Sequence, residues 1–130
     1  MDRLSVIIFR NNEGKILLQY RDSGAPAAAL MWSFFGGNAE GDETAEEAIL
    51  REVQEELRIH IDSSELHLLA NEVHTEECER NVFFFECTRP VSWNAIDVHE
   101  GAGAAFLSKE EIATMGSITE TARYFVSTYA

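Results

Sequence analysis

Three glutamates, Glu52, Glu55 and Glu56, lie close together in a segment that otherwise has the composition of a helix. Glu52 and Glu56 are four residues apart, a spacing at which two like charges destabilise a helix by roughly 0.2–0.5 kcal/mol. Between positions 38 and 57 the only basic residue is Arg51. Two interpretations remain open, because the carboxylates could bind a divalent cation or could form a solvated acidic face.

The segment that carries these acids has the signals of an amphipathic helix. Thr44 is a favourable N-cap, and Glu47, three residues later, completes a capping box. At about 100° per residue, the acids occupy one arc of the helix and the apolar residues occupy the adjacent arc. The sequence therefore predicts a helix that presents an acidic face beside a core face. The core face consists of Ile49, Leu50, Val53 and Leu57.

Residues 37–59 resemble the Nudix box, whose form is Gly-x5-Glu-x7-Arg-Glu-U-x-Glu-Glu-x-Gly-U, with U a bulky aliphatic residue. Residues 32–37, which lead into the box, are also similar to the family. Two residues differ from the family pattern: Arg58 replaces the last glycine, and Phe35 stands where many members have proline. If Arg58 ends the helix in the left-handed conformation, the cost is about 1 kcal/mol. The positions that match the box are Gly37, Glu43, Arg51, Glu52, Val53, Glu55, Glu56 and Ile59.

The resemblance implies a Mg²⁺ site, with Mn²⁺ as an alternative. It assigns Glu52 and Glu56 as the main metal ligands and Glu55 as a further ligand or a residue that holds water. The backbone carbonyl of Gly36 would be an additional ligand. Hard oxygen donors of this kind are those that Mg²⁺ prefers.

The resemblance also implies supporting and catalytic roles. Arg51 would orient the glutamates, while Glu43 and Gly37 would fix the loop against the helix; the alternative for Arg51 and Glu43 is a purely structural ion pair. Two residues compete as general base. Glu55 lies inside the box, and Glu100 lies in a later glycine-containing segment, where it could also be an extra metal ligand or a solvated loop acid.

Two residues outside the box are candidates for substrate binding. Arg21, just past the second expected strand, could contact phosphate, although a surface salt bridge is the alternative. Trp93 lies among polar residues and is a candidate for stacking on a nucleobase.

The formal net charge of −13 disfavours a protein that binds a nucleic-acid polymer, because such affinity depends on Lys and Arg. A polyphosphate substrate would also be repelled unless divalent cations lowered its charge. The first apolar run, at residues 4–9, is too short for a signal peptide or a membrane span, so we expect a cytoplasmic protein without membrane contact. In that compartment Cys78 and Cys87 are expected to be free thiols. The oligomeric state, monomer or homodimer, remains open.

The length of 130 residues predicts one domain, covering residues 1–130. The mixture of strands and helices predicts an α/β fold with a mixed β-sheet flanked by helices, and the resemblance implies the Nudix-type α/β/α sandwich. The first two strands are expected to form a hairpin around a turn at residues 11–14. Strands are expected at residues 5–10, 15–20, 32–35, 65–74, 81–88 and 104–107, with a weaker candidate at 93–98, and further helices at 108–114 and 118–129.

The resemblance implies a Mg²⁺-dependent pyrophosphohydrolase acting on a nucleoside diphosphate linked to a second group. Subfamily signatures for ADP-ribose, dinucleoside polyphosphates, NADH and coenzyme A are absent, which leaves a nucleoside or deoxynucleoside triphosphate as the expected substrate. Water attack at phosphorus would give the monophosphate and pyrophosphate. The alternatives are a nucleotide-sugar or ADP-ribose-type diphosphatase, and a non-catalytic nucleotide-binding sensor.

Overall fold

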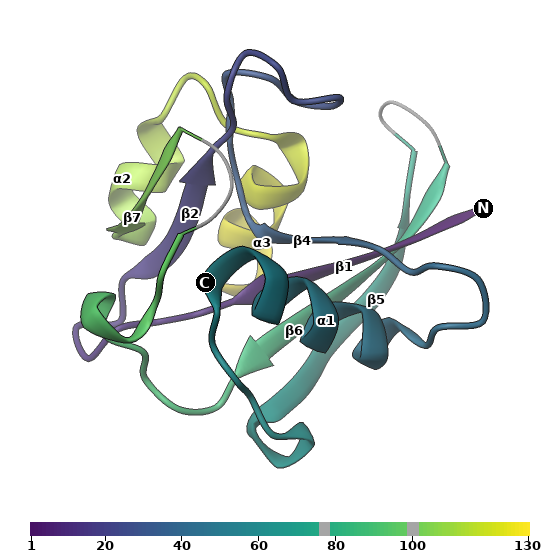
Figure 1. The fold of residues 1–130 in the computed structure, drawn as a ribbon. Helices are drawn as coiled ribbons and strands as arrows, with labels where there is room; N and C mark the ends of the chain where they lie inside the picture. The colour runs from purple at the N-terminus through teal and green to yellow at the C-terminus, as the bar shows by residue number, and fades with distance from the viewer. Residues whose placement is uncertain (76–78, 99–101) are drawn as a thin grey trace.

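The chain was analysed as a computed structural model, which describes residues 1–75, 79–98 and 102–130. Within these residues the strands form a four-stranded and a three-stranded sheet (Figure 1). The four-stranded sheet has the order β4-β1-β6-β5 and is mixed, because β1 is parallel to β6 and antiparallel to β4. Its strands are β1 (Asp2–Ile8), β4 (Phe35–Asn38), β5 (Leu66–His74) and β6 (Arg80–Cys87).

The three-stranded sheet has the order β3-β2-β7 and is antiparallel. It consists of β2 (Ile16–Tyr20), β3 (Trp32–Ser33) and β7 (Gly103–Leu107). The chain passes from this sheet to the four-stranded one at Phe34, between β3 and β4. The glycine pair of β4 is therefore held at the junction between the two sheets.

Helices cover both faces of the sheets. Alternate residues of β1 enter two different apolar clusters: Val6 and Ile8 pack with α3 (Glu120–Tyr129), whereas Ile7 packs with α1 (Ala45–Leu57). The short helix α2 (Lys109–Thr114) lies on the same side as α3. The α/β fold with a helix-flanked mixed sheet is thus confirmed.

The boundaries of the box helix agree with its sequence signals. The Thr44 side chain accepts a hydrogen bond from the Glu47 amide, and the Glu47 carboxylate accepts one from the Thr44 amide, so the predicted capping box is present. Arg58 ends the helix in the left-handed conformation, with φ of 55°, and its amide donates to the Gln54 carbonyl. Arg58 thus adopts the conformation for which the Nudix box has glycine.

Three expectations about strands are wrong. The first two strands do not pair along their length, because β1 and β2 belong to different sheets. The expected hairpin is confined to the turn, where Arg10 bridges Ile16, the Leu17 amide donates to the Phe9 carbonyl and the Asn11 amide donates to the Lys15 carbonyl. Residues 93–98 do not form a strand and instead begin with the 3₁₀ turn Trp93–Ala95. The sequence pattern of β5 predicts that Leu66, Leu68 and Ala70 share one face, but a register shift between Leu68 and Ala70 interrupts this alternation, and Leu68 is exposed.

A 3₁₀ turn at Ser63–Glu65 precedes β5. Cys87 is a free, buried thiol as expected, and burial raises the pKa of that thiol, whereas Cys78 lies outside the described residues. None of the helices in the described ranges has the length and apolar character needed to cross a bilayer.

Candidate active site

The glycine pair of β4 allows the strand backbone to lie directly against the acidic face of α1. A Cβ atom on Gly36, whose φ is +151°, would lie 2.0 Å from the Ser5 carbonyl oxygen of β1. A Cβ atom on Gly37 would lie 2.4 Å from Glu52 Oε1. Real Cβ atoms do not approach other atoms so closely. Residue 36 therefore requires glycine, because its Cβ would meet the backbone of β1, whereas a Cβ atom on residue 37 would have to displace the Glu52 side chain.

Glu56 is the most deeply buried of the three clustered glutamates, with 4% of its surface exposed. Its Oε1 accepts a hydrogen bond of 3.2 Å from the Gly36 amide. A charged group so far from water is stabilised only where donors or cations face it. The sequence placed Glu56 on an acidic face, and the structure shows that this part of the face is covered by β4.

Arg51 contacts several of the surrounding acids. Its Nε and Nη2 atoms donate to the two carboxylate oxygens of Glu43, at 2.8 and 3.0 Å, in a bidentate pair. Its Nη1 atom donates to Glu52 Oε1 at 2.9 Å and lies 3.5 Å from Glu55 Oε2. A fork of donors fixed in this way holds the Glu52 side chain beside Gly37.

The Glu43–Arg51 pair has strong electrostatic consequences for both groups. The hydrogen bonds from Arg51 and from the Glu40 amide lower the pKa of Glu43 from 4.5 to about 2. The same pair raises the pKa of Arg51 above its ordinary value. Glu43 therefore remains a carboxylate, and Arg51 a cation, across the range in which proteins function.

Glu55 differs from the other two glutamates of the cluster because 59% of its side chain is exposed. Its contact with Arg51, at 3.5 Å, is longer than those that Arg51 makes with Glu43 and Glu52. The other candidate base, Glu100, lies outside the described residues. The structure thus describes only one of the two.

The oxygen donors at the junction of α1 and β4 suit a hard divalent cation. The carboxylates of Glu52 and Glu56 lie against the peptide groups of Gly37 and Gly36, so that two acids and a strand backbone meet in one place. Among residues 1–75, 79–98 and 102–130, no three His, Cys, Asp or Glu side chains are arranged so that they could hold a metal ion together. The donor types fit Mg²⁺ or Mn²⁺, and the assignments of Glu52, Glu55, Glu56 and the Gly36 carbonyl as ligands stay predictions.

A cavity of about 320 Å³ opens beside the glycine pair and shares Gly36 and Gly37 with the acidic site. Its walls include apolar side chains from β1 and the 26–31 loop, the start of α3 and two arginines. Arg21, which the sequence analysis gave as a candidate for substrate binding, lies in this wall. Its Nε donates to the Ala27 carbonyl at 2.8 Å. Arg80 is a second lining arginine that the sequence analysis missed, because only the pairing of β6 with β1 brings it here.

Ser33 also lines this cavity and has an unusual property. Its hydroxyl oxygen is buried and has no hydrogen-bond partner among the described residues, and the same is true of Oε1 of Gln19, its register partner in β2. Buried hydroxyl groups in proteins are normally hydrogen-bonded. Trp93, by contrast, is not among the described residues that line this cavity; it is half-exposed and packs edge-to-face against Phe106.

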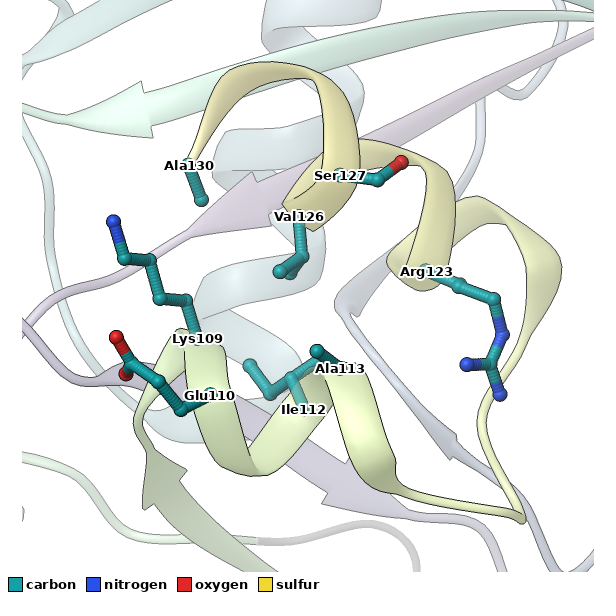
Figure 2. A pocket seen from close by; sticks show the side chains of 8 residues that line it. All are labelled: Lys109, Glu110, Ile112, Ala113, Arg123, Val126, Ser127 and Ala130. Carbon is teal, nitrogen blue, oxygen red and sulfur yellow. The ribbon is translucent and has the colours of Figure 1, made fainter.

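A second cavity, of about 450 Å³, lies between α2 and α3 (Figure 2). Figure 2 shows Ile112 and Val126 in its middle, with Lys109 at one end and Arg123 at the other. The Arg123 guanidinium donates to the Met115 carbonyl at 2.9 Å. The two cavities share no described lining residue, and this one has no box residue in its wall.

Comparison with known proteins identifies the family. The NUDIX domain model matches residues 1–129. An uncharacterized Nudix hydrolase from Listeria monocytogenes is 33% identical over 123 residues, which cover 94% of this chain and 72% of that protein. The CTP pyrophosphohydrolase of Escherichia coli is 47% identical over 47 residues, which cover 36% of this chain and 34% of that enzyme.

Solved structures agree on the fold. A MutT protein from Methanosarcina mazei Go1 superposes with a TM-score of 0.80 at 24% identity, covering 97% of this chain and 90% of that one. The ORF135 protein of Escherichia coli gives a TM-score of 0.77 at 22% identity, covering 99% and 88%. At these identities the structures establish the fold alone. From the domain match and the Listeria relative, the chain belongs to the Nudix hydrolase family, whose members act on phosphoanhydride bonds.

Proposed function

We propose that the protein is a divalent-metal-dependent pyrophosphohydrolase that converts a nucleoside or deoxynucleoside triphosphate to the monophosphate and pyrophosphate. The observation that carries this proposal is the contact between the carboxylates of Glu52 and Glu56 and the Gly36–Gly37 backbone. This contact places concentrated negative charge at the edge of a cavity that also contains Arg21 and Arg80.

The metal-binding role falls to the residues at the junction of α1 and β4. Glu52, Glu56 and the Gly36 carbonyl would hold Mg²⁺ or Mn²⁺, with Glu55 as a further ligand or a residue that positions water. The chemistry that such an ion supplies is neutralisation of phosphate charge and a lowered pKa of water. Arg51 keeps the Glu52 carboxylate in place, since it is itself fixed by the bidentate pair with Glu43.

The proton of the attacking water needs an acceptor that solvent can reach. We assign this role to Glu55, because its carboxylate is exposed and makes only a long contact with Arg51. An exposed carboxylate can accept a proton and return it to solvent after each turnover. Glu100 remains the competing base.

The cavity beside the glycine pair would hold the nucleoside. Apolar walls suit a base and sugar, while arginines suit phosphate oxygens. Gly36 and Gly37 line this cavity and also contact Glu56 and Glu52, so in this proposal the phosphates of a bound nucleotide would extend past the two glycines towards these acids. This shared boundary supports a substrate in which a nucleoside is joined directly to a polyphosphate.

The partial match to a CTP pyrophosphohydrolase supports a triphosphate and makes cytidine nucleotides the first to test. The test is a panel of ribo- and deoxyribonucleoside triphosphates, nucleotide sugars and ADP-ribose, assayed with Mg²⁺ or Mn²⁺ for monophosphate and pyrophosphate release. We expect a triphosphate to be cleaved fastest. If a nucleotide sugar or ADP-ribose is cleaved fastest, the proposed substrate is wrong and the protein is a diphosphatase of that type. If nucleotides bind but none is cleaved, the protein is a nucleotide sensor.

The Glu56→Gln variant tests the site within the same assay. The substitution removes a charge and almost no volume, so the domain should remain folded while turnover falls about a hundredfold or more. Turnover close to that of the parent would contradict the proposed metal site.

A further inference from the structure

Arg3 lies in β1, far from the box in sequence, yet its side chain holds the turn that precedes α1. Its Nη1 atom donates to the Glu43 carbonyl at 2.7 Å, and its Nη2 atom donates to the Gly41 carbonyl at 3.1 Å. The backbone carbonyl of Arg3 accepts a third hydrogen bond, of 2.9 Å, from the Ala39 amide. Arg3 thus binds the turn at its beginning, middle and end.

This turn passes through a glycine in the left-handed conformation. Gly41 has a left-handed φ of +53°, and a Cβ atom built there would meet nothing within 4 Å, so that side of the glycine is open. Within the turn the Glu43 amide donates to the Glu40 carbonyl at 2.9 Å. The two carbonyls that Arg3 binds belong to residues two apart in the sequence, and one planar guanidinium can reach both, whereas a lysine ammonium lacks the fork geometry.

The turn matters because it carries Glu43. The side chain of Glu43 receives the two short hydrogen bonds from Arg51, and its Oε1 also accepts one of 3.0 Å from the Glu40 amide. Arg51 in turn donates to Glu52 Oε1 at 2.9 Å. A continuous series of hydrogen bonds therefore leads from Arg3 through Glu43 and Arg51 to the carboxylate beside Gly37.

We infer that Arg3 is a positioning residue of the active site: it fixes the 39–43 turn on β1 so that Glu43 holds Arg51, and Arg51 holds Glu52 against the Gly37 backbone. Without Arg3, Glu43 loses the support of its own carbonyl, and the bidentate pair with Arg51 is formed for a smaller fraction of the time. Arg51 then constrains Glu52 less well. The inference rests on the proposed function only in assigning Glu52 as a metal ligand.

The test compares Arg3→Ala with Arg3→Lys and with a matched control, Arg10→Ala. Arg10 lies just beyond the other end of β1, is also partly buried, and donates from Nε to Glu86 Oε2 at 3.1 Å. Among the described residues, the hydrogen-bond and ion-pair partners of Arg10 do not include a residue of the box. Both alanine variants thus remove a partly buried arginine next to β1, but only one affects the support of Glu43.

We expect Arg3→Ala to lower kcat about tenfold with little change in KM, which is the scale observed when groups that orient metal ligands are removed. Arg3→Lys, which can bind one carbonyl, should recover part of this loss, and Arg10→Ala should retain the parent kcat. The second readout is Mn²⁺ affinity, measured by titration calorimetry in the absence of nucleotide. We expect it to weaken about tenfold in Arg3→Ala and to stay unchanged in Arg10→Ala.

The two readouts separate this inference from the proposed function. If the parent cleaves no nucleotide but binds Mn²⁺, and Arg3→Ala alone weakens that binding, then Arg3 positions the site and the proposed substrate is wrong. If both kcat and Mn²⁺ affinity are the same in Arg3→Ala and the parent, the inference is overturned. It is also overturned if Arg10→Ala causes an equal loss, or if the parent does not bind Mn²⁺. Should Arg3→Ala fail to fold, Arg3→Lys with Arg10→Lys gives the same comparison.

Discussion

The Glu52 carboxylate lies against the backbone of Gly37, so closely that a Cβ atom on residue 37 would be 2.4 Å from Oε1 and 2.6 Å from Cδ. This relationship makes Gly37→Ala a direct test of the site. The backbone of Gly37 does not have a positive φ, so alanine is not strained there by its backbone. The substitution therefore acts by displacing the Glu52 side chain. We expect turnover to fall about tenfold or more. Steady-state kinetics with the best nucleotide of the panel would measure this loss.

Gly116→Ala is the matched control, since a Cβ atom there would meet nothing within 4 Å. It should leave turnover unchanged. If Gly37→Ala turns over substrate as fast as Gly116→Ala, then the position of the Glu52 carboxylate beside β4 does not contribute to turnover.

The general base can be assigned by comparing Glu55→Gln with Glu100→Gln. We expect Glu55→Gln to lower kcat about 10²-fold or more while KM changes little, because removing a general base slows proton transfer and leaves substrate binding intact. A large loss in Glu100→Gln together with normal turnover in Glu55→Gln would transfer the role to Glu100.

The sequence predicted those parts of the fold that depend on neighbouring residues. The capping box at Thr44 and Glu47 and the helix that begins after Ser108 follow from side chains three residues apart, and the structure confirms both. The pairing of the first two strands was predicted wrongly, because the true partners of β1 lie far from it in the sequence. Val6 of β1 pairs with Gly36 on one side and Phe84 on the other, and such distant pairing leaves no local signal in an apolar run.

The same limit applies to the site. An ion pair between Glu43 and Arg51 was one of the two alternatives that the sequence left open for these residues, and the bidentate contact is present. The contributions of Arg3 and Arg80 could not be predicted, since β1 and β6 bring them to the turn and to the cavity from distant parts of the chain. The burial of Glu56 likewise depends on β4 covering one side of the helix.

Ser33 provides a prediction about stability. Its buried hydroxyl has no partner among the described residues, so Ser33→Ala removes an unsatisfied polar atom and should leave the free energy of unfolding unchanged or raise it. Ser5→Ala is the contrasting control, because the buried Ser5 hydroxyl donates to the Ala45 carbonyl at 2.9 Å and its loss should destabilise by about 1 kcal/mol. Urea denaturation of both variants measures the difference. A clear loss of stability in Ser33→Ala would mean that its hydroxyl is satisfied in solution.

The last prediction concerns acid stability and the contact between β5 and α3. Tyr129 of α3 donates a hydrogen bond to the Glu72 carboxylate of β5. This bond, followed by those from Tyr124 and His74, lowers the pKa of Glu72 below its ordinary value of 4.5. Because the folded state favours the ionised carboxylate, the contribution of Glu72 to stability is fully present above pH 4.5 and is lost as the pH falls through the lower, folded-state pKa.

Tyr129→Phe removes the largest cause of this shift, so the pKa of Glu72 should return towards 4.5 and the free energy of unfolding should fall less steeply with decreasing pH below that value. Urea denaturation at several pH values between about 3 and 7 would measure the slope. Glu72→Gln should also reduce the slope of the unfolding free energy against pH in this range. Adding Tyr129→Phe to Glu72→Gln should change that slope no further, because the two substitutions remove one interaction. Equal slopes in the parent and Tyr129→Phe would show that this hydrogen bond does not hold Glu72 ionised.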